Sequence, residues 1–246
     1  MPPHRRQQPF RPLIPRILAL FCGIAAFLAG SVALAEESAP PPAERAANEY
    51  LRPHRFGPLT DDDFQAPPPK DASRPEASYA AWLTQEIRWA SRYQTLRGGK
   101  TWRAKVAEIQ VFAAVWRDQS WNRRHGQSDA AVLDHEQGHF DINQTHAVRL
   151  EIEVRQKIAA GKPPQAEGKT EQEAVDKLKE ILRQSVATTH SSATVENQEY
   201  DRQTTHGSDQ PKQQEFRHLQ KAALEKVAQE LEALLAAKKT PIKSEK

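Results

Sequence analysis

Apolar and polar positions alternate along residues 101–117, the period of two that is typical of a strand with one buried face. The segment 97–100, with the sequence RGGK, is a turn signal between this stretch and residues 79–93. The pattern predicts an antiparallel hairpin or small sheet, although residues 79–90 are also compatible with a helix. The alternating apolar positions are Ile109, Val111, Ala113 and Val115.

The spacing of apolar residues changes to three and four after residue 128, which predicts a long helix. Ser128 is a favourable N-cap residue, and the helix is expected to end at Ala160, before Gly161 and a Pro-Pro pair. The HEQGH motif at 135–139 lies on the face that should turn toward the core or a cleft. The residues near that face are Val132, His135, His139, Ile142, His146 and Leu150.

Two further helices are predicted, with a polar segment between them. Thr170 and Glu173 have the spacing of a capping box at the start of the first. The last helix is expected to begin near Pro211, and the polar residues 188–207 are expected to form a long connection. The apolar positions are Val175, Leu178, Ile181, Leu182 and Val186 in the first helix, and Phe216, Leu219, Ala223, Leu224, Val227, Leu231 and Leu234 in the last.

Residues 1–35 have the composition of a secretory signal peptide. Four arginines precede an apolar run that ends in Ala33-Leu34-Ala35, the small-x-small form of a signal-peptidase site. The alternative is an uncleaved anchor, since the run is almost long enough to span a bilayer. Cleavage after Ala35 would place the protein in the periplasm or outside the cell, with no stable membrane insertion.

The remaining chain suits one domain with flexible ends. Residues 36–55 are rich in proline and charge, which predicts a disordered linker. The domain is expected over residues 56–240, with Leu59 and Phe64 as anchors onto its core, and residues 241–246 form a polar tail. The hydrophobic fraction of 38% is low and favours long amphipathic helices in an α+β fold.

Charge and cysteine content argue against several classes of function. The formal charge of +3 falls by four, to −1, when the arginines of the leader are removed, so nothing favours a nucleic-acid partner. The only cysteine, Cys22, lies in the leader. The mature chain therefore cannot be a thiol enzyme, and any metal site must use nitrogen and oxygen ligands.

The HEQGH motif has the residues of a catalytic zinc site. His135 and His139 are one helical turn apart and project from one side, within reach of one ion. Glu136 lies beside them, where a carboxylate could take the proton from a zinc-activated water. The alternative is a pair of partly buried histidines that are hydrogen-bonded in the core.

A third ligand is expected from the polar segment near residue 200. We favour His206, with Asp201 next and Glu196 or Glu199 behind; Asp201 could instead orient a ligating imidazole. Tyr200 is a candidate donor to the oxyanion. His146 is too far along a continuous helix to share an ion with His139, and an ordinary polar linker is the alternative for the whole segment.

Four segments together resemble a bacterial family of predicted secreted zinc-dependent proteases, catalogued as a domain of unknown function and grouped with the zincin-type metallopeptidases. The resemblance implies a zincin-like α+β fold, Zn²⁺ held through His135 and His139, and Glu136 as the base. In such a fold, an edge strand over 106–115 would bind an extended peptide. The segments are LTDDDFQ (59–65), DQSW (118–121), LDHEQGHFDI (133–142) and YDRQTTHG (200–207).

Two classes of function fit these observations. The first is a secreted or periplasmic zinc metallopeptidase that hydrolyses peptide or protein substrates. The second is a non-catalytic zinc-binding envelope scaffold or partner-binding module. Glu136 favours the first, since hydrolysis needs a carboxylate at this position and a purely structural metal site does not.

Overall fold

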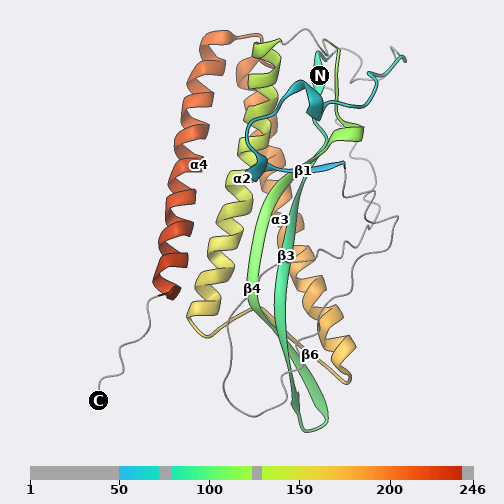
Figure 1. Cartoon of the computed structure of the whole chain (residues 1–246), viewed down its shortest axis with the longest axis vertical. Helices are drawn as coiled ribbons and strands as arrows, with labels where there is room; N and C mark the ends of the chain where they lie inside the picture. The colour runs from blue at the N-terminus through green and yellow to red at the C-terminus, as the bar shows by residue number, and fades with distance from the viewer. Residues whose placement is uncertain (1–49, 72–78, 124–128, 240–246) are drawn as a thin grey trace.

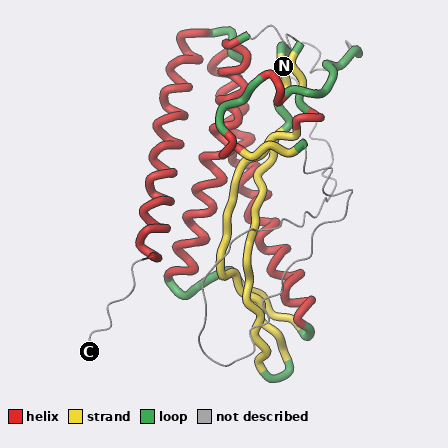
Figure 2. The backbone as a smooth tube through the Cα atoms, in the orientation of Figure 1, coloured by secondary structure: helices red, strands yellow, loops and turns green. Residues whose placement is uncertain are grey.

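A long antiparallel hairpin forms the centre of the structure, a computed structural model that describes residues 50–71, 79–123 and 129–239. Three long helices run alongside this hairpin (Figures 1 and 2), so the predicted α+β class is confirmed. The helices are α2 (Ala130–Ala159), α3 (Glu171–Thr204) and α4 (Gln210–Lys239). The strands are β1 (Leu51–Pro53), β2 (Ala81–Trp82), β3 (Gln85–Gly98), β4 (Thr101–Trp116), β5 (Trp121–Asn122) and β6 (Gln165–Gly168), with short 3-10 helices at His54–Phe56, Asp61–Asp63 and Arg117–Gln119.

The predicted hairpin is confirmed as β3 and β4. Gly99 occupies the turn with a φ of 62°, a left-handed conformation that glycine adopts without strain. Pairing runs from Gln85 opposite Val115 to Gly98 opposite Thr101, with one irregularity after Arg92. Residues 85–90 are therefore strand, and the helical alternative for 79–90 is wrong there. The alternating apolar side chains of β4 point into the core, where they meet α2 and α3.

Strand β4 is central and not an edge. It pairs with β3 along one side. On its other side, it pairs with β6 near its start and with β1 near its end. Between the β6 and β1 pairings, side chains of α2 accept hydrogen bonds from the backbone of β4. Val111 N–H donates to Glu151 Oε2 and Ala113 N–H donates to Gln144 Oε1, each at 2.8 Å. The expectation that 106–115 is an edge open to an extended peptide is wrong, because α2 covers that edge.

Helix α2 lies between α4 and the sheet, as Figure 1 shows, and buries side chains toward both. Its N-cap is Asp129, whose carboxylate accepts from the backbone N–H groups of Ala131 and Val132. The predicted N-cap Ser128 lies outside the described residues. The helix ends at Ala159, and Gly161 follows with a φ of 72°, so the predicted end is confirmed within one residue.

Helix α3 continues to Thr204, so the expected connection over 188–207 is wrong for nearly all of its length. The segment lacks glycine and proline before Gly207, and its hydroxyls donate to carbonyls four residues earlier within the helix. Its buried residues also recur at helical spacing, but most are small or polar. They are Ala193, Asn197, Tyr200 and Thr204.

Helix α4 begins at Gln210, next to Pro211 as predicted. Val227 is buried and Phe216 packs against the core as expected, but Leu219 is 56% exposed and does not belong to the predicted apolar face. Polar residues take the buried positions in the first half of the helix: Gln213, Arg217 and Gln220. This half of α4 therefore faces α2 with hydrogen-bonding groups.

The described chain starts inside the predicted linker. Leu51–Pro53 forms β1 and pairs with the end of β4, so the linker over 36–55 cannot extend to residue 55. Leu59 and Phe64 are buried, which confirms them as core anchors. The expected signal peptide (1–35) and polar tail (241–246) lie outside the described residues. Within the described ranges, no helix is long and apolar enough to cross a bilayer.

Glu151 is predicted to contribute strongly to stability. The Glu151→Ala substitution should lower the free energy of unfolding by about 2–4 kcal/mol, because it leaves the Val111 N–H without its acceptor and the Arg155 guanidinium without its carboxylate partner. Urea denaturation measures this loss. Glu153→Ala, which removes an exposed pair with Lys157 on the same helix, is the control and should have little effect. Equal effects of the two substitutions would show that the β4 edge does not depend on Glu151.

Candidate metal centre

Two imidazoles and one carboxylate converge where α2 meets α3. The Nε2 atoms of His135 and His139 lie 3.2 Å apart. Asp201 of α3 places Oδ1 at 3.2 Å from the first and 2.9 Å from the second. All three ligand atoms lie within 4.8 Å of one another, as a shared metal ion requires.

The spacing of the three groups suits a small divalent metal ion, for which zinc geometry gives a measure. Zinc bonds of about 2.1 Å in a tetrahedron imply ligand atoms about 3.4 Å apart, close to the separations among His135, His139 and Asp201. Two imidazole nitrogens and one carboxylate oxygen also match the sulfur-free ligand set that the sequence demands. The structure therefore has a buried His-His-Asp group that could hold a metal ion.

The electrostatics favour an ionised Asp201. Burial alone would raise the pKa of its carboxyl group, but the charge of His139 and the hydrogen bonds to His135 and His139 outweigh burial and hold the pKa below its usual range. The carboxylate thus presents a negatively charged oxygen to the space between the two rings.

The other ring nitrogen of each histidine faces a carboxamide oxygen. His139 Nδ1 lies 2.8 Å from Asn197 Oδ1 on α3, and His135 Nδ1 lies 3.1 Å from Gln213 Oε1 on α4. Both amides are buried. Each ring is therefore held from behind by an amide, and α3 and α4 supply one amide each.

Tyr200 packs behind the histidines and does not face the space between them and Asp201. Its ring stacks on that of His135 with centroids 4.9 Å apart, and its hydroxyl donates to the His135 carbonyl oxygen at 3.4 Å. The side chain is 1% exposed, and burial raises the pKa of the phenol. In this structure the hydroxyl faces the α2 backbone and Gln213, and the expected role as an oxyanion donor stays a prediction.

The alternative ligand Asp201, and not the favoured His206, belongs to the converging group. His206 is exposed, and its Nδ1 lies 3.5 Å from Asp201 Oδ1. It sits beyond the end of α3 in a left-handed turn formed by Thr205, His206 and Gly207, whose φ angles are 50°, 51° and 79°. Gly207 is required there, since a Cβ would lie 2.9 Å from the ring of His135.

Of the other sequence candidates, Glu196 and Glu199 lie apart from the metal-ligand group and Glu136 lies beside it. Glu196 pairs with His146 at 2.8 Å, and Glu199 pairs with Arg202, so neither glutamate belongs to the metal-ligand group. Glu136, the predicted base, is buried next to His135 on α2. The structure therefore brings the predicted ligands His135 and His139 together with Asp201, which the sequence offers only as an alternative, and buries Glu136 beside them.

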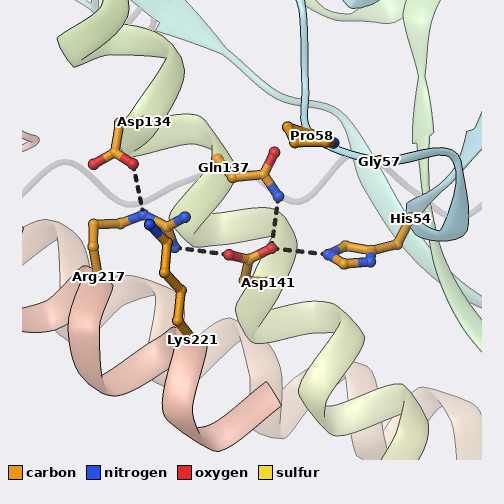
Figure 3. Close-up of a pocket in the computed structure, with 8 residues that line it drawn as sticks. All are labelled: His54, Gly57, Pro58, Asp134, Gln137, Asp141, Arg217 and Lys221. Carbon is orange, nitrogen blue, oxygen red and sulfur yellow. Dashed lines mark hydrogen bonds and ion pairs between the residues drawn. The ribbon is translucent and has the colours of Figure 1, made fainter. Parts of the chain in front are cut away.

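A network of charged residues joins α2 to α4 beside the metal-ligand group (Figure 3). Arg217 pairs with Asp134 through Nε at 3.0 Å and with Asp141 through Nη1 at 2.9 Å. Asp141 also contacts His54 Nε2 at 2.8 Å and accepts from Gln137. Burial would raise the pKa of Asp141, but the bonds from His54 and Arg217 hold it below its usual range.

This network borders an opening of about 320 Å³ between α2, α4 and the loop after β1. Asp134 links it to the metal-ligand group, because its Oδ2 accepts from Gln213 Nε2 at 3.3 Å while Gln213 Oε1 faces His135. Asn197, Gln213 and Arg217 were not among the sequence candidates. The signal that could have found them is their spacing, since Asn197 lies one turn before Asp201 and Gln213 one turn before Arg217.

No protein-family model, curated protein or solved structure matches the chain. The zincin-like fold therefore remains a prediction, and function has to be inferred from the residues of the site.

Gly138 is predicted to be essential for the packing of Tyr200. Alanine usually stabilises a helix interior relative to glycine, but a Cβ at Gly138 would lie 2.4 Å from the Tyr200 hydroxyl. Gly138→Ala should therefore destabilise the protein by about 1–3 kcal/mol, measured by thermal or urea unfolding. Gly98→Ala is the control, since no atom lies within 4 Å of its added Cβ. Stabilisation by Gly138→Ala would contradict the observed position of Tyr200.

Asp201 and His206 are predicted to differ in their effect on metal binding. Asp201→Ala should weaken zinc binding by more than about 100-fold, since loss of a ligand costs more than the 10–100-fold typical of its outer partners. His206→Ala should change it by less than about 10-fold, because this residue lies outside the converging group. Chelator competition and elemental analysis of both variants measure the difference, and the reverse order would restore His206 as the third ligand.

Proposed function

We propose that the protein is a zinc-dependent metallopeptidase that hydrolyses peptide bonds. The observation that carries this proposal is the convergence of His135, His139 and Asp201 beside the buried carboxylate of Glu136. A structural zinc site is usually closed by four protein ligands, whereas a catalytic site has three and leaves one position open. Three converging ligands match the catalytic pattern.

The metal ligands and Glu136 have different roles in the proposed hydrolysis. Zinc held by the three ligands would supply Lewis acidity, which polarises the scissile carbonyl and makes water more acidic. Glu136 accepts the proton of the attacking water and returns it to the leaving amine. His135 and His139 remain fixed by Gln213 and Asn197, so the ligand atoms keep their positions while the proton moves.

The proposed substrate class and compartment rest on features of the sequence. The leader composition and the absence of cysteine after Cys22 favour a periplasmic or secreted enzyme acting on peptides or proteins. The resemblance of HEQGHFDI and YDRQTTHG to predicted secreted zinc-dependent proteases supports the same reaction. Because α2 covers the β4 edge, a bound peptide would have to use another surface near the metal-ligand group.

A zinc-stabilised envelope scaffold is the second candidate, and the burial of the ligands favours it. The side chains of His135 and His139 are 9% and 6% exposed, and that of Asp201 is 17% exposed. Such a site would bind zinc without hydrolysis. The two candidates agree on metal binding and differ in the need for Glu136.

Glu136→Gln is predicted to separate the two functions. It should retain zinc, because Glu136 is not among the converging ligands, and lower peptide hydrolysis by about 10²–10⁴-fold through loss of the base. The assay is cleavage of a mixed peptide library by the zinc-loaded wild type, with Glu153→Gln on the exposed side of α2 as control. Full activity in Glu136→Gln would overturn Glu136 as the base, whereas no cleavage by the wild type would leave the scaffold as the better account.

A further inference from the structure

We propose that Asn197 and Gln213 are positioning residues that set which nitrogen of His139 and His135 faces the metal. This inference rests on the metal centre of the proposed function, but not on hydrolysis. An imidazole can bind a metal through either nitrogen, and the hydrogen bond made by the other nitrogen decides which one is used. In this structure both Nδ1 atoms face amide oxygens and both Nε2 atoms face Asp201.

The amide oxygens can only accept, so each Nδ1 must carry a proton and donate it. Nε2 is then the nitrogen that releases its proton to solvent and offers its lone pair when a cation binds beside Asp201. Both amides are buried, and the distances of 2.8 Å for Asn197 and 3.1 Å for Gln213 are those of hydrogen bonds. Loss of either acceptor would leave an Nδ1–H buried and free the ring to rotate.

The orientation of the Gln213 amide is fixed by charges behind it. Its Nε2 donates to Asp134, and Asp134 is held by Arg217 one turn along α4. Because the nitrogen is directed at a carboxylate, the oxygen must be directed at His135. The buried ion pair between α2 and α4 therefore determines which end of the amide meets the imidazole.

Neutral amides also differ from the carboxylates that often occupy this position behind metal-binding histidines. A carboxylate makes the histidine more basic and adds a negative charge near the ion. With Asn197 and Gln213 as acceptors, Asp201 is the only anion in contact with the two imidazoles through a described interaction.

The proposal predicts opposite changes in zinc affinity for two substitutions at Asn197. Asn197→Ala removes the acceptor and should weaken zinc binding by about 10–100-fold. Asn197→Asp keeps the acceptor and adds a negative charge near the ion, so it should tighten zinc binding several-fold. If Asn197 served packing alone, both substitutions would weaken binding. Gln198→Ala, at the exposed neighbouring position, should leave the affinity unchanged.

The same test at α4 covers the case in which the Asn197 variants fail to fold. Gln213→Ala should weaken zinc binding about 10–100-fold, with exposed Gln214→Ala as the matched control. Zinc affinity is measured by chelator competition on folded protein. Nitrogen-15 NMR of the zinc-loaded wild type should show protonated Nδ1 in both His135 and His139.

Weaker binding by Asn197→Asp, unchanged binding by Gln213→Ala, or protonated Nε2 in the loaded protein would each overturn the proposal. These readouts do not use hydrolysis. A wild type that binds zinc with this pattern but cleaves no peptide would refute the peptidase and leave the positioning roles intact.

Discussion

The burial of polar groups on α2 is the constraint on which the rest of the structure depends. This helix lies between the sheet and α4, and it carries carboxylates, amides and histidines on its buried faces. A buried polar group without a partner costs about 1–3 kcal/mol, so each neighbouring element must present a matching group. Backbone N–H groups of β4 donate to Gln144 and Glu151 of α2. Helix α3 presents Asn197 and Asp201, and α4 presents Gln213 and Arg217.

This matching also explains why the site is made from three helices. An i,i+4 pair of histidines on one helix supplies two ligands but cannot supply the acceptors behind its own rings. The third ligand and one acceptor come from α3 as a second i,i+4 pair, Asn197 and Asp201. The other acceptor comes from α4, which the pairing of Arg217 with Asp134 and Asp141 holds against α2.

The sequence predicts elements where burial is apolar and regular, and fails where burial is polar. The hairpin and α2 follow from their periods of two and of three to four, and HEQGH identifies two ligands. The sequence predicts a loop for the second half of α3 because its buried positions include Asn197 and Thr204, which carry no hydrophobic signal. Once the segment is a helix, Asp201 shares a face with Asn197, and His206 falls beyond the helix end.

The distance along the chain between the candidate ligands would couple metal binding to folding. His135 and Asp201 are 66 residues apart in sequence, so the unfolded chain has no preformed site for a third ligand. An ion that binds only the folded form shifts the folding equilibrium, and each tenfold rise in free ion above the dissociation constant adds about 1.4 kcal/mol. The docking of α3 on α2 would thus depend on metal supply, and the stability of the fold would report the metal content of its compartment.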